Sequence, residues 1–415
     1  MIHDGAPSVD WLTEDVDQLL RQHRTGYAMA RGFYTSPAVY EEDIKTYWNQ
    51  TWIWVGHLCQ LPKNGSFFRF DYGPESLIIA RDRKGEVGAF VNVCRHRGAR
   101  VCPEASGRTH AFTCPYHAWV YELNGDLRAA REMGEGFDRE DHGLLKAHIR
   151  IMEGLIFVST AEDPPEIDTA IAGLTPLIAP FGLERMKIAH EASYPVPANW
   201  KLAVENYMEC YHCGPAHLDF SQSHSLKDPS SVTPELLAAL RAARAKAGLS
   251  PAGEFSQHNI EADTKRLDAW SGSYPLYPGY HTGSRDGQLV APLLGDLKAP
   301  FDGANDLQLG ILNNLLIYSD HVVGYRFVPR GLQDTDIQMV WYVREDAVEG
   351  VDYDLEALTW LWHVTTQDDE RIIRVNQEGV NSYHFRPGPL SQMEEFMRGF
   401  YDGYLNTLRR ARGLA

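Results

Sequence analysis

Two segments, V-C-R-H-R-G at residues 93–98 and C-P-Y-H-A-W at residues 114–119, each place one cysteine and one histidine in a short stretch. Seventeen residues, positions 97 to 113, lie between the two pairs. Thiolate sulfur and imidazole nitrogen are both strong metal ligands, so two loops here offer four ligands to one metal centre. The four candidate ligands are Cys94, His96, Cys114 and His117.

The order of these ligands distinguishes two kinds of metal centre. A tetrahedral zinc site of this composition usually pairs cysteine with cysteine and histidine with histidine. Here each loop supplies one of each, as a [2Fe-2S] cluster requires when thiolates bind one iron and imidazoles the other. Exchanging two thiolates for imidazoles raises the reduction potential from about −400 mV to between about −150 and +300 mV. The pattern favours the iron–sulfur cluster, and a zinc-stabilised ligand-binding protein is the alternative.

A second set of ligand-type residues lies in E-N-Y-M-E-C-Y-H-C-G-P-A-H at residues 205–217. If residues 201–213 form one helix, then Glu205, Glu209 and His212 are spaced by four and three residues and share one face. Such a helix would present two acids and an imidazole together. This composition is typical of a metal-binding face.

His217 follows His212 by five residues, which on a continuous helix would place it about 140° around the axis. Gly214 and Pro215 lie between the two histidines and predict that the helix ends there. The following turn can then bring His217 back beside His212. We therefore expect the two imidazoles to bind one metal ion.

A non-haem iron that activates oxygen typically uses two histidines and one carboxylate. The segment W-H-V-T-T-Q-D-D-E-R-I-I at residues 362–373 offers the carboxylate. On a helical wheel Asp369 falls at the centre of an apolar stripe, whereas Asp368 and Glu370 each lie about 100° away. An acid within an apolar stripe needs a partner, so Asp369 is the expected third ligand. The stripe consists of Leu355, Leu358, Trp362, Thr365, Ile372 and Ile373.

These motifs resemble those of the Rieske non-haem iron oxygenases, in their oxygenase (alpha) component, over nearly the whole chain. The resemblance implies an α+β fold, with a small antiparallel β Rieske domain and a larger catalytic domain. In the catalytic domain it implies an antiparallel sheet packed by helices, of the helix-grip, START-like kind. It also implies a [2Fe-2S] Rieske cluster on the first ligand set and a mononuclear Fe(II) on His212, His217 and Asp369.

The pattern along the chain is consistent with that organisation. Residues 1–48 form an amino-terminal helical segment, with one helix expected at 39–50, and residues 49–162 alternate short β-branched and aromatic runs with turns. The acidic, proline-rich stretch at 161–168 marks a boundary. Residues 163–415 mix strand patterns with helical patterns, and a loop-like region at 250–303 is long enough for a lid or pocket wall. The helical patterns cover residues 234–249, 354–377 and 392–412.

Glu209 stands where the resemblance implies a carboxylate that links His212 to the cluster ligand His117 of a neighbouring subunit in a homotrimer. Most of the wider family has aspartate at this position. The glutamate of this chain departs from that pattern. In this respect the chain resembles the oxygenases that act on quaternary ammonium compounds, such as stachydrine, glycine betaine and carnitine. A carboxylate that orients a metal-bound imidazole fits the role. Asn206 is a further candidate for a supporting contact at this site.

The resemblance implies O2 and a small organic substrate as reactants. The chain has no G-x-G-x-x-G after a strand, so electrons must come from a separate NAD(P)H-dependent reductase or a ferredoxin. The favoured reaction is oxidative N-demethylation of a betaine-like quaternary ammonium compound. Ring hydroxylation or dihydroxylation of an aromatic acid is the alternative. Aromatic faces would hold a methylated ammonium, and the tyrosines available near the expected pocket are Tyr211, Tyr274, Tyr277 and Tyr280.

Composition and charge exclude some classes of partner. The chain of 415 residues carries a formal net charge of −17 without a long Lys/Arg run, which argues against nucleic acid or an anionic membrane as a partner. No stretch offers eighteen unbroken apolar residues and the first residues are not signal-like, so we expect a cytoplasmic protein. The six cysteines are accordingly expected to be reduced thiols or metal ligands, with no chemistry assigned to Cys210 and Cys213.

Overall fold

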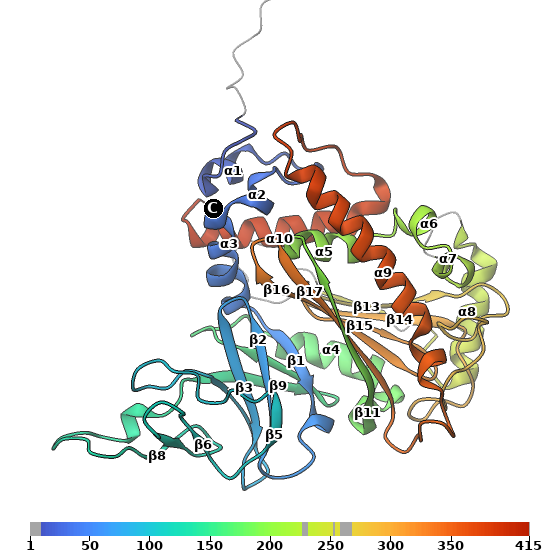
Figure 1. The fold of residues 1–415 in the computed structure, drawn as a ribbon. Helices are drawn as coiled ribbons and strands as arrows, with labels where there is room; N and C mark the ends of the chain where they lie inside the picture. Colours follow the sequence, from blue (N-terminus) through green and yellow to red (C-terminus); the bar gives the residue numbers. More distant parts are fainter. Residues whose placement is uncertain (1–9, 226–230, 252–253, 258–267, 415) are drawn as a thin grey trace, which may run out of the picture.

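The computed structural model describes residues 10–225, 231–251, 254–257 and 268–414. Within these ranges a helical segment leads into a β part, which is followed by a larger part in which helices cover a second sheet (Figure 1). The α+β fold predicted from the sequence is confirmed.

The amino-terminal segment is helical. Ser36 caps its third helix by accepting from the Val39 N–H, and Pro37 occupies the first turn, where its missing N–H costs no hydrogen bond. The helix predicted at 39–50 is confirmed, although its later turns are wider and then tighter than an α-helix. The elements are α1 Val16–Gln22, α2 Gly32–Thr35, α3 Pro37–Glu42, a π-helical turn at Asp43–Tyr47 and a 3-10 turn at Trp48–Gln50.

The β part contains two antiparallel sheets. The larger has seven strands in the order β1-β10-β9-β4-β3-β2-β5, and the smaller has three in the order β6-β7-β8. The strands are β1 Ile53–His57, β2 Ser66–Tyr72, β3 Glu75–Arg81, β4 Val87–Val91, β5 Ser106–Arg108, β6 Phe112–Thr113, β7 Val120–Tyr121, β8 Leu127–Ala129, β9 Lys146–Met152 and β10 Leu155–Ser159. The first Cys–His loop therefore lies between β4 and β5 of the larger sheet, and the second connects β6 to β7 of the smaller one.

The larger part is built on a seven-stranded antiparallel sheet with the order β11-β17-β16-β15-β14-β13-β12. The region predicted to be a loop at 250–303 is not wholly a loop, because β12 and β13 form there and pair with each other. The strands are β11 Met186–Val196, β12 Phe255–Gln257, β13 Ala269–Pro275, β14 Gly303–Leu309, β15 Asn314–Ile317, β16 Val322–Gly331 and β17 Asp334–Arg344.

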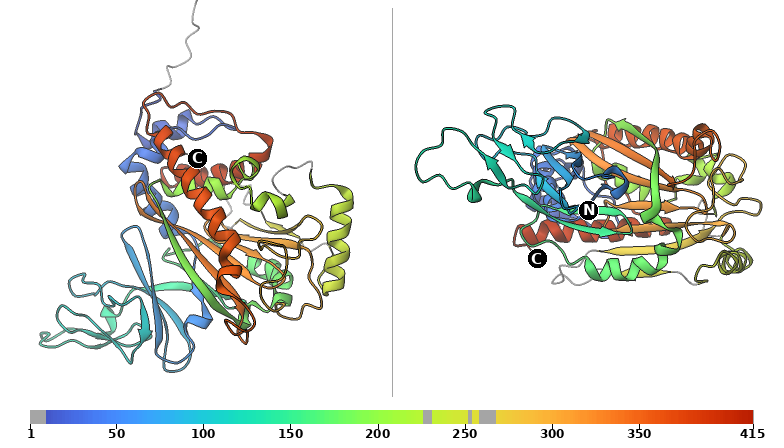
Figure 2. Two further views of the ribbon diagram at one scale, coloured as in Figure 1. Left: turned by 45° about the vertical axis from the view of Figure 1, so that its right-hand side comes forward. Right: turned by 90° about the horizontal axis from the view of Figure 1, so that it is seen from below.

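Helices cover both faces of this sheet (Figure 2). Alternation along β15 explains why: Leu315 and Ile317 pack in the same core as α4, whereas Leu316 packs with Trp362 of α9 on the other face. The three long helices predicted from sequence periodicity are confirmed as α8, α9 and α10. The helices are α4 Asp168–Ile178, α5 Trp200–Tyr207, α6 Cys213–Ala216, α7 Phe220–Ser223, α8 Pro234–Ala247, α9 Leu355–Val380 and α10 Glu395–Ala411.

Strand β1 fixes the β part to the larger sheet. The Trp54 N–H donates to Oδ1 of Asn313 at 2.5 Å, and Nδ2 of Asn313 donates to the Trp52 carbonyl at 2.9 Å. Arg326 donates to the Val55 carbonyl at 2.8 Å, and its guanidinium lies 4.9 Å from the ring centroid of Trp54. These buried contacts make the two parts one packed body.

Candidate metal centres

The two Cys–His loops repeat one backbone design. In the first loop the Cys94 N–H donates to the Ala99 carbonyl at 2.8 Å, and the Gly98 N–H donates back to the Cys94 carbonyl at 3.0 Å. In the second the Cys114 N–H donates to the carbonyl five residues ahead at 2.8 Å, and the Ala118 N–H donates back to the Cys114 carbonyl at 3.0 Å. Gly98 and Ala118 occupy equivalent positions and both have positive φ, 79° and 58°. Each tight turn thus aims its ligands at the other loop.

The four side chains divide into a buried pair and an exposed pair. Cys94 and Cys114 are 3% and 2% exposed, whereas His96 and His117 lie at the surface. The two imidazole rings are 4.6 Å apart between centroids, and Trp119 stacks on His96 at 4.9 Å. Sulfur donors inside and nitrogen donors outside fit a cluster with two different irons, one of them at the surface.

Tyr121 supports the sulfur side of this centre. Its hydroxyl oxygen lies 3.2 Å from Sγ of Cys94 and accepts from the Arg95 N–H at 3.0 Å. Hydrogen bonds to the sulfurs are one of the means by which proteins set the potential of an iron–sulfur cluster. The spacing of the Cys and His residues did not indicate Tyr121, because only its place on strand β7 brings it to the sulfur.

The helix predicted to run from Lys201 to Cys213 is wrong, because α5 ends at Tyr207. Beyond it, the Glu209 carboxylate accepts from the backbone N–H groups of Tyr211 and His212, the latter at 3.2 Å. A side chain that captures backbone donors in this way competes with helical hydrogen bonds.

Two further expectations for this segment fail with the helix. Glu205 does not share a face with His212; it is buried elsewhere and accepts from the Tyr34 hydroxyl at 2.8 Å. Gly214 and Pro215 were expected to break a helix, but they lie inside the short helix α6. The His217 N–H donates to the Cys213 carbonyl at 3.1 Å, so α6 itself carries His217 back toward His212.

The structure does bring His212, His217 and Asp369 together. Nε2 of His212 lies 3.1 Å from Nε2 of His217, and Oδ1 of Asp369 lies 3.0 Å from the second nitrogen and 3.4 Å from the first. Two ligands held about 2.1 Å from an ion at a right angle are themselves about 3.0 Å apart. The triangle therefore has the dimensions of three ligands on one face of an iron ion.

Burial and charge at this triangle also fit a cation. Oδ1 of Asp369 is buried without an aligned hydrogen-bond donor in the described part of the chain, although both imidazoles are near it. Burial opposes a charge on His212, but Asp369 and Glu209 outweigh it and raise the pKa of this imidazole to about 9. The same two histidines favour ionised Asp369 and lower its pKa despite burial. The site thus attracts positive charge, which a bound iron supplies.

Three neighbouring residues complete the surroundings of the triangle. Nδ1 of His212 lies 2.5 Å from Oε1 of Glu209, so this carboxylate fixes the ring from behind. The amide nitrogen of Asn206 lies 3.4 Å from Nε2 of His212. Oδ2 of Asp368, which the helical wheel put at the edge of the stripe, lies 3.5 Å from Nδ1 of His217.

The expectation of reduced thiols is wrong for one pair. Cys210 and Cys213 form a disulfide, with their Cα atoms 4.9 Å apart. Sγ of Cys213 is close to the two imidazoles, but a disulfide sulfur is not a thiolate and is therefore no substitute for Asp369 as the third ligand. The described cysteines outside this bond form no disulfide, namely Cys59, Cys94, Cys102 and Cys114.

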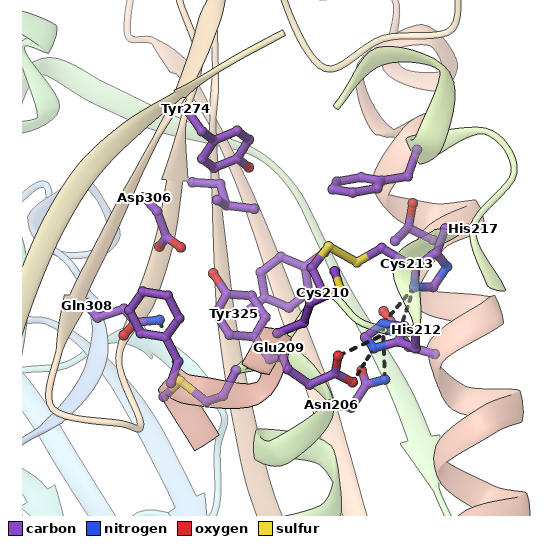
Figure 3. A pocket seen from close by; sticks show the side chains of 18 of the residues that line it. Asn206, Glu209, Cys210, His212, Cys213, His217, Tyr274, Asp306, Gln308 and Tyr325 are labelled. Atoms are coloured by element: carbon purple, nitrogen blue, oxygen red, sulfur yellow. Dashed lines mark hydrogen bonds and ion pairs between the residues drawn. A yellow bond between two sulfur atoms is a disulfide. The ribbon is translucent and has the colours of Figure 1, made fainter. Parts of the chain in front are cut away.

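A cavity of about 380 Å³ opens onto the triangle (Figure 3). Aromatic rings form much of its wall, and the described lining includes no Lys or Arg. Of the tyrosines considered from sequence, Tyr274 lines the cavity, whereas Tyr211 is 57% exposed. Sequence reasoning missed the other rings and an acid, Asp306, on strand β14. The missed rings are Tyr207, Phe220, Trp270, Tyr325, Trp362 and Phe396.

A ligand set suited to a cluster at the surface, and a second set suited to an enclosed iron beside a cavity, are what an iron-dependent oxygenase requires. Two family descriptions match the chain: "Rieske [2Fe-2S] domain" over residues 51–148 and "Ring hydroxylating alpha subunit (catalytic domain)" over residues 183–409.

Individual proteins agree with these matches. The glycine betaine monooxygenase oxygenase subunit of Chromohalobacter salexigens is 35% identical over 403 residues, which are 94% of this chain and 88% of that protein. The carnitine monooxygenase oxygenase subunit of Acinetobacter baumannii is 33% identical over 46% of this chain and 53% of its own length. A crystal structure of a quaternary ammonium Rieske monooxygenase superposes with a TM-score of 0.69 at 22% identity, covering 97% of this chain and 99% of the other.

The chain belongs to the Rieske non-haem iron oxygenases, as an oxygenase (alpha) component. Membership brings a Rieske [2Fe-2S] cluster, a mononuclear iron, O2 and a small-molecule substrate, together with an electron donor that is a reductase or a ferredoxin. The alternative of a zinc-stabilised binding protein is set aside. Among the helices that the structure describes, none combines the length and apolarity needed to cross a bilayer.

Proposed function

We propose that this oxygenase demethylates a betaine-like quaternary ammonium compound oxidatively, with electrons from an NAD(P)H-dependent reductase or a ferredoxin. One atom of O2 enters a C–H bond of an N-methyl group, and the other leaves as water with two electrons and two protons. The hydroxymethyl group then leaves as formaldehyde, which releases the tertiary amine and a proton. The iron, when bound, supplies the binding and reduction of O2.

The wall of the cavity is the observation that carries the proposal. A methylated ammonium has no hydrogen to donate, so aromatic faces and negative charge are what can hold it. Tyr325 and Trp362 lie side by side at the iron end, with ring centroids 5.8 Å apart, and Phe220 lies 5.8 Å from Trp362. The proteins that oxidise glycine betaine and carnitine are relatives of this chain.

The same wall disfavours the alternative, an aromatic acid. The carboxylate of such a substrate would need a cationic partner, and burying it unpaired is costly. The described lining offers carboxylates of its own, among them Glu209 and Asp306, and neither Lys nor Arg. The ammonium group of a betaine-like substrate is therefore the part that matches this wall electrostatically.

We assign the ligands and supporting groups on their geometry. Cys94, His96, Cys114 and His117 hold the cluster, and His212, His217 and Asp369 hold the mononuclear iron. Glu209 orients His212 through Nδ1 and, in the assembly, would link this imidazole to the cluster of a neighbouring subunit. Asn206 supports the cavity side of the same ring.

Electron transfer favours a homotrimer. The cluster loops adjoin β6 and β7 at the far tip of the β part, whereas α6 and α9 lie at the other end of the molecule, and the views of Figures 1 and 2 agree on this. Transfer within one chain would cross the whole molecule. A head-to-tail ring would instead set the cluster of one subunit against the iron site of the next.

Exposed groups at the two ends are suited to such an interface. Val93 and Tyr116, beside the cluster ligands, are 39% and 55% exposed, and Tyr211 and Leu218, beside the iron ligands, are 57% and 74% exposed. Exposed apolar side chains at both ends can cover one another in the assembly. His96 and His117 would then face the Glu209 of the next copy.

The test combines metal analysis with product analysis. Anaerobically purified protein should show about three irons and two sulfides per chain, the sum of one cluster and one mononuclear site, and a Rieske EPR signal after dithionite. With a surrogate reductase, quaternary ammonium compounds should yield formaldehyde and demethylated amine in equal amounts, whereas aromatic acids should not be hydroxylated. Hydroxylation of aromatic acids without formaldehyde from any ammonium compound would refute the substrate class and leave the oxygenase class standing.

A further inference from the structure

Asp306 is an acid in an unusual place. On strand β14, Leu307 and Leu309 point into the core beneath α4, while Asp306 and Gln308 point to the opposite face and line the cavity. The sheet thus holds a carboxylate rigidly in an aromatic wall. Tyr207 and Tyr274 also line the cavity, and burial and then the charge of Asp306 raise the pKa of each.

One oxygen of this carboxylate, Oδ1, lacks a hydrogen-bond partner within the described chain, while the Leu307 backbone N–H interacts with the carboxylate. Its Oδ1 is closed off from solvent and accepts no hydrogen bond, and the hydroxyl of Tyr207 is likewise buried and unpaired. Burial raises the pKa of Asp306 to about 7. A buried polar group without a partner costs free energy, so one that persists in a cavity is a place where a ligand can supply the missing contact.

Asp306 is not placed to touch the reacting methyl group. It lies on the sheet side of the cavity, and His212 and His217 lie on the other side, with Tyr325 and the Cys210 sulfur between them (Figure 3). A substrate whose N-methyl group faces the iron would extend its opposite end toward Asp306. The chemistry of that end is then selected by the carboxylate.

We propose that Asp306 is the specificity-determining residue for the end of the substrate remote from the oxidised methyl group. It selects a hydrogen-bond donor or a cationic group there, such as a hydroxyl or a protonated amine, over a carboxylate. The assignment rests on the proposed N-demethylation, because the methyl group at the iron sets the direction of the substrate. It narrows the betaine-like class to quaternary ammonium compounds whose other end is a donor, and so sets this chain apart from the relatives that oxidise glycine betaine and carnitine, both of which carry a carboxylate. A hydroxyl or a protonated amine can donate to the open Oδ1 of Asp306, whereas a carboxylate cannot.

The probes are trimethylammonium compounds of increasing chain length that end in a hydroxyl, an amine or a carboxylate. Binding is measured by calorimetry and turnover by formaldehyde release, for the iron-loaded full chain and for Asp306→Asn. We expect the wild type to prefer donor-tailed probes, and Asp306→Asn to shift the preference toward carboxylate tails by at least about tenfold, the scale of a charge-assisted hydrogen bond. Asp306→Ser removes the same charge with a smaller side chain, should the amide not be accommodated.

Asp302→Asn is the matched control, because Asp302 is an acid directly before β14 whose side chain is 44% exposed and does not line the cavity. It should leave the tail preference unchanged. A wild type that prefers carboxylate tails, or an Asp306 variant that changes all tails equally, would overturn the assignment. Binding that follows the expected order without formaldehyde would uphold Asp306 and refute the demethylation, and the absence of any binding would refute both.

Discussion

The cluster loops and the iron triangle hold their ligands by different means. Each loop is closed by its own backbone hydrogen bonds, and the same pair of bonds occurs in both. The triangle is assembled from the two residues that flank α6 and from α9, which contacts α6 and packs against β11. A local turn fixes the first site, and tertiary packing fixes the second. The two should therefore respond differently to substitution.

The largest contrast is expected from Asp369→Ala. It removes one of the three proposed iron ligands, so turnover should fall more than about 100-fold, beyond the loss usual for groups that only support a ligand. Iron content should fall from about three to about two per chain, and the Rieske EPR signal should persist because the loops are untouched. The iron content and the EPR signal are both measured on the same sample.

Asp368→Ala is the matched control for that substitution. Asp368 is 39% exposed and lies 3.5 Å from His217, so its loss should lower turnover by less than about tenfold, the lower bound for such supporting groups. Equal losses from both substitutions would contradict the assignment of Asp369 as the ligand.

A smaller effect is expected from Glu209→Gln, which tests the link between the two sites. The amide keeps the size of the side chain but removes the charge that lies 2.5 Å from Nδ1 of His212. Turnover should fall about 10- to 100-fold. Iron content and the cluster spectrum should stay near those of the wild type, since no ligand is lost. If single turnover with a pre-reduced cluster is as fast as in the wild type, Glu209 has no part in electron transfer.

The same contrast explains what the sequence could predict. The Cys–His loops are local, so their spacing alone named all four candidate ligands. The place of Asp369 beside the two histidines could be predicted because one continuous helix, α9, obeys the 3.6-residue period. Each of these predictions needs only one element or one turn.

The failures concern features that no local period encodes. The stretch after Tyr207 contains no glycine or proline until Gly214, and its helix ends because the Glu209 carboxylate captures two backbone donors. Asp306 lies in G-A-N-D-L-Q-L, and only the position of β14 in the finished sheet shows which face meets the cavity. The disulfide likewise depends on how the chain turns between Cys210 and Cys213.

The free energy of unfolding should depend on pH through Glu205, which is buried in α5. Burial raises the pKa of Glu205 to about 8, above its ordinary value of 4.5. The folded state therefore retains this proton more strongly, and the associated stability is complete below about pH 4.5 and is lost as the pH rises toward 8. Glu205→Gln should flatten this decline, by at most about 1.4 kcal/mol per pH unit. Urea unfolding of both proteins at pH 6 and pH 8 measures the change in stability. If the variant loses as much stability as the wild type between these pH values, groups other than Glu205 cause the pH dependence.

The smallest expected effect is a change in stability from substitutions at equivalent positions of the two cluster loops. Gly98 and Ala118 occupy equivalent positions at φ 79° and 58°, and a Cβ on Gly98 would meet no atom within 4 Å. Gly98→Ala should therefore cost only the backbone strain of a left-handed alanine, about 1–2 kcal/mol. Ala118→Gly should relieve that strain, and the exchange of both residues should restore most of the stability. Urea unfolding followed by the visible absorption of the cluster measures all three variants. If Gly98→Ala is harmless and Ala118→Gly is damaging, the loops share hydrogen bonds but not strain, and the Ala118 methyl group must make a contact of its own.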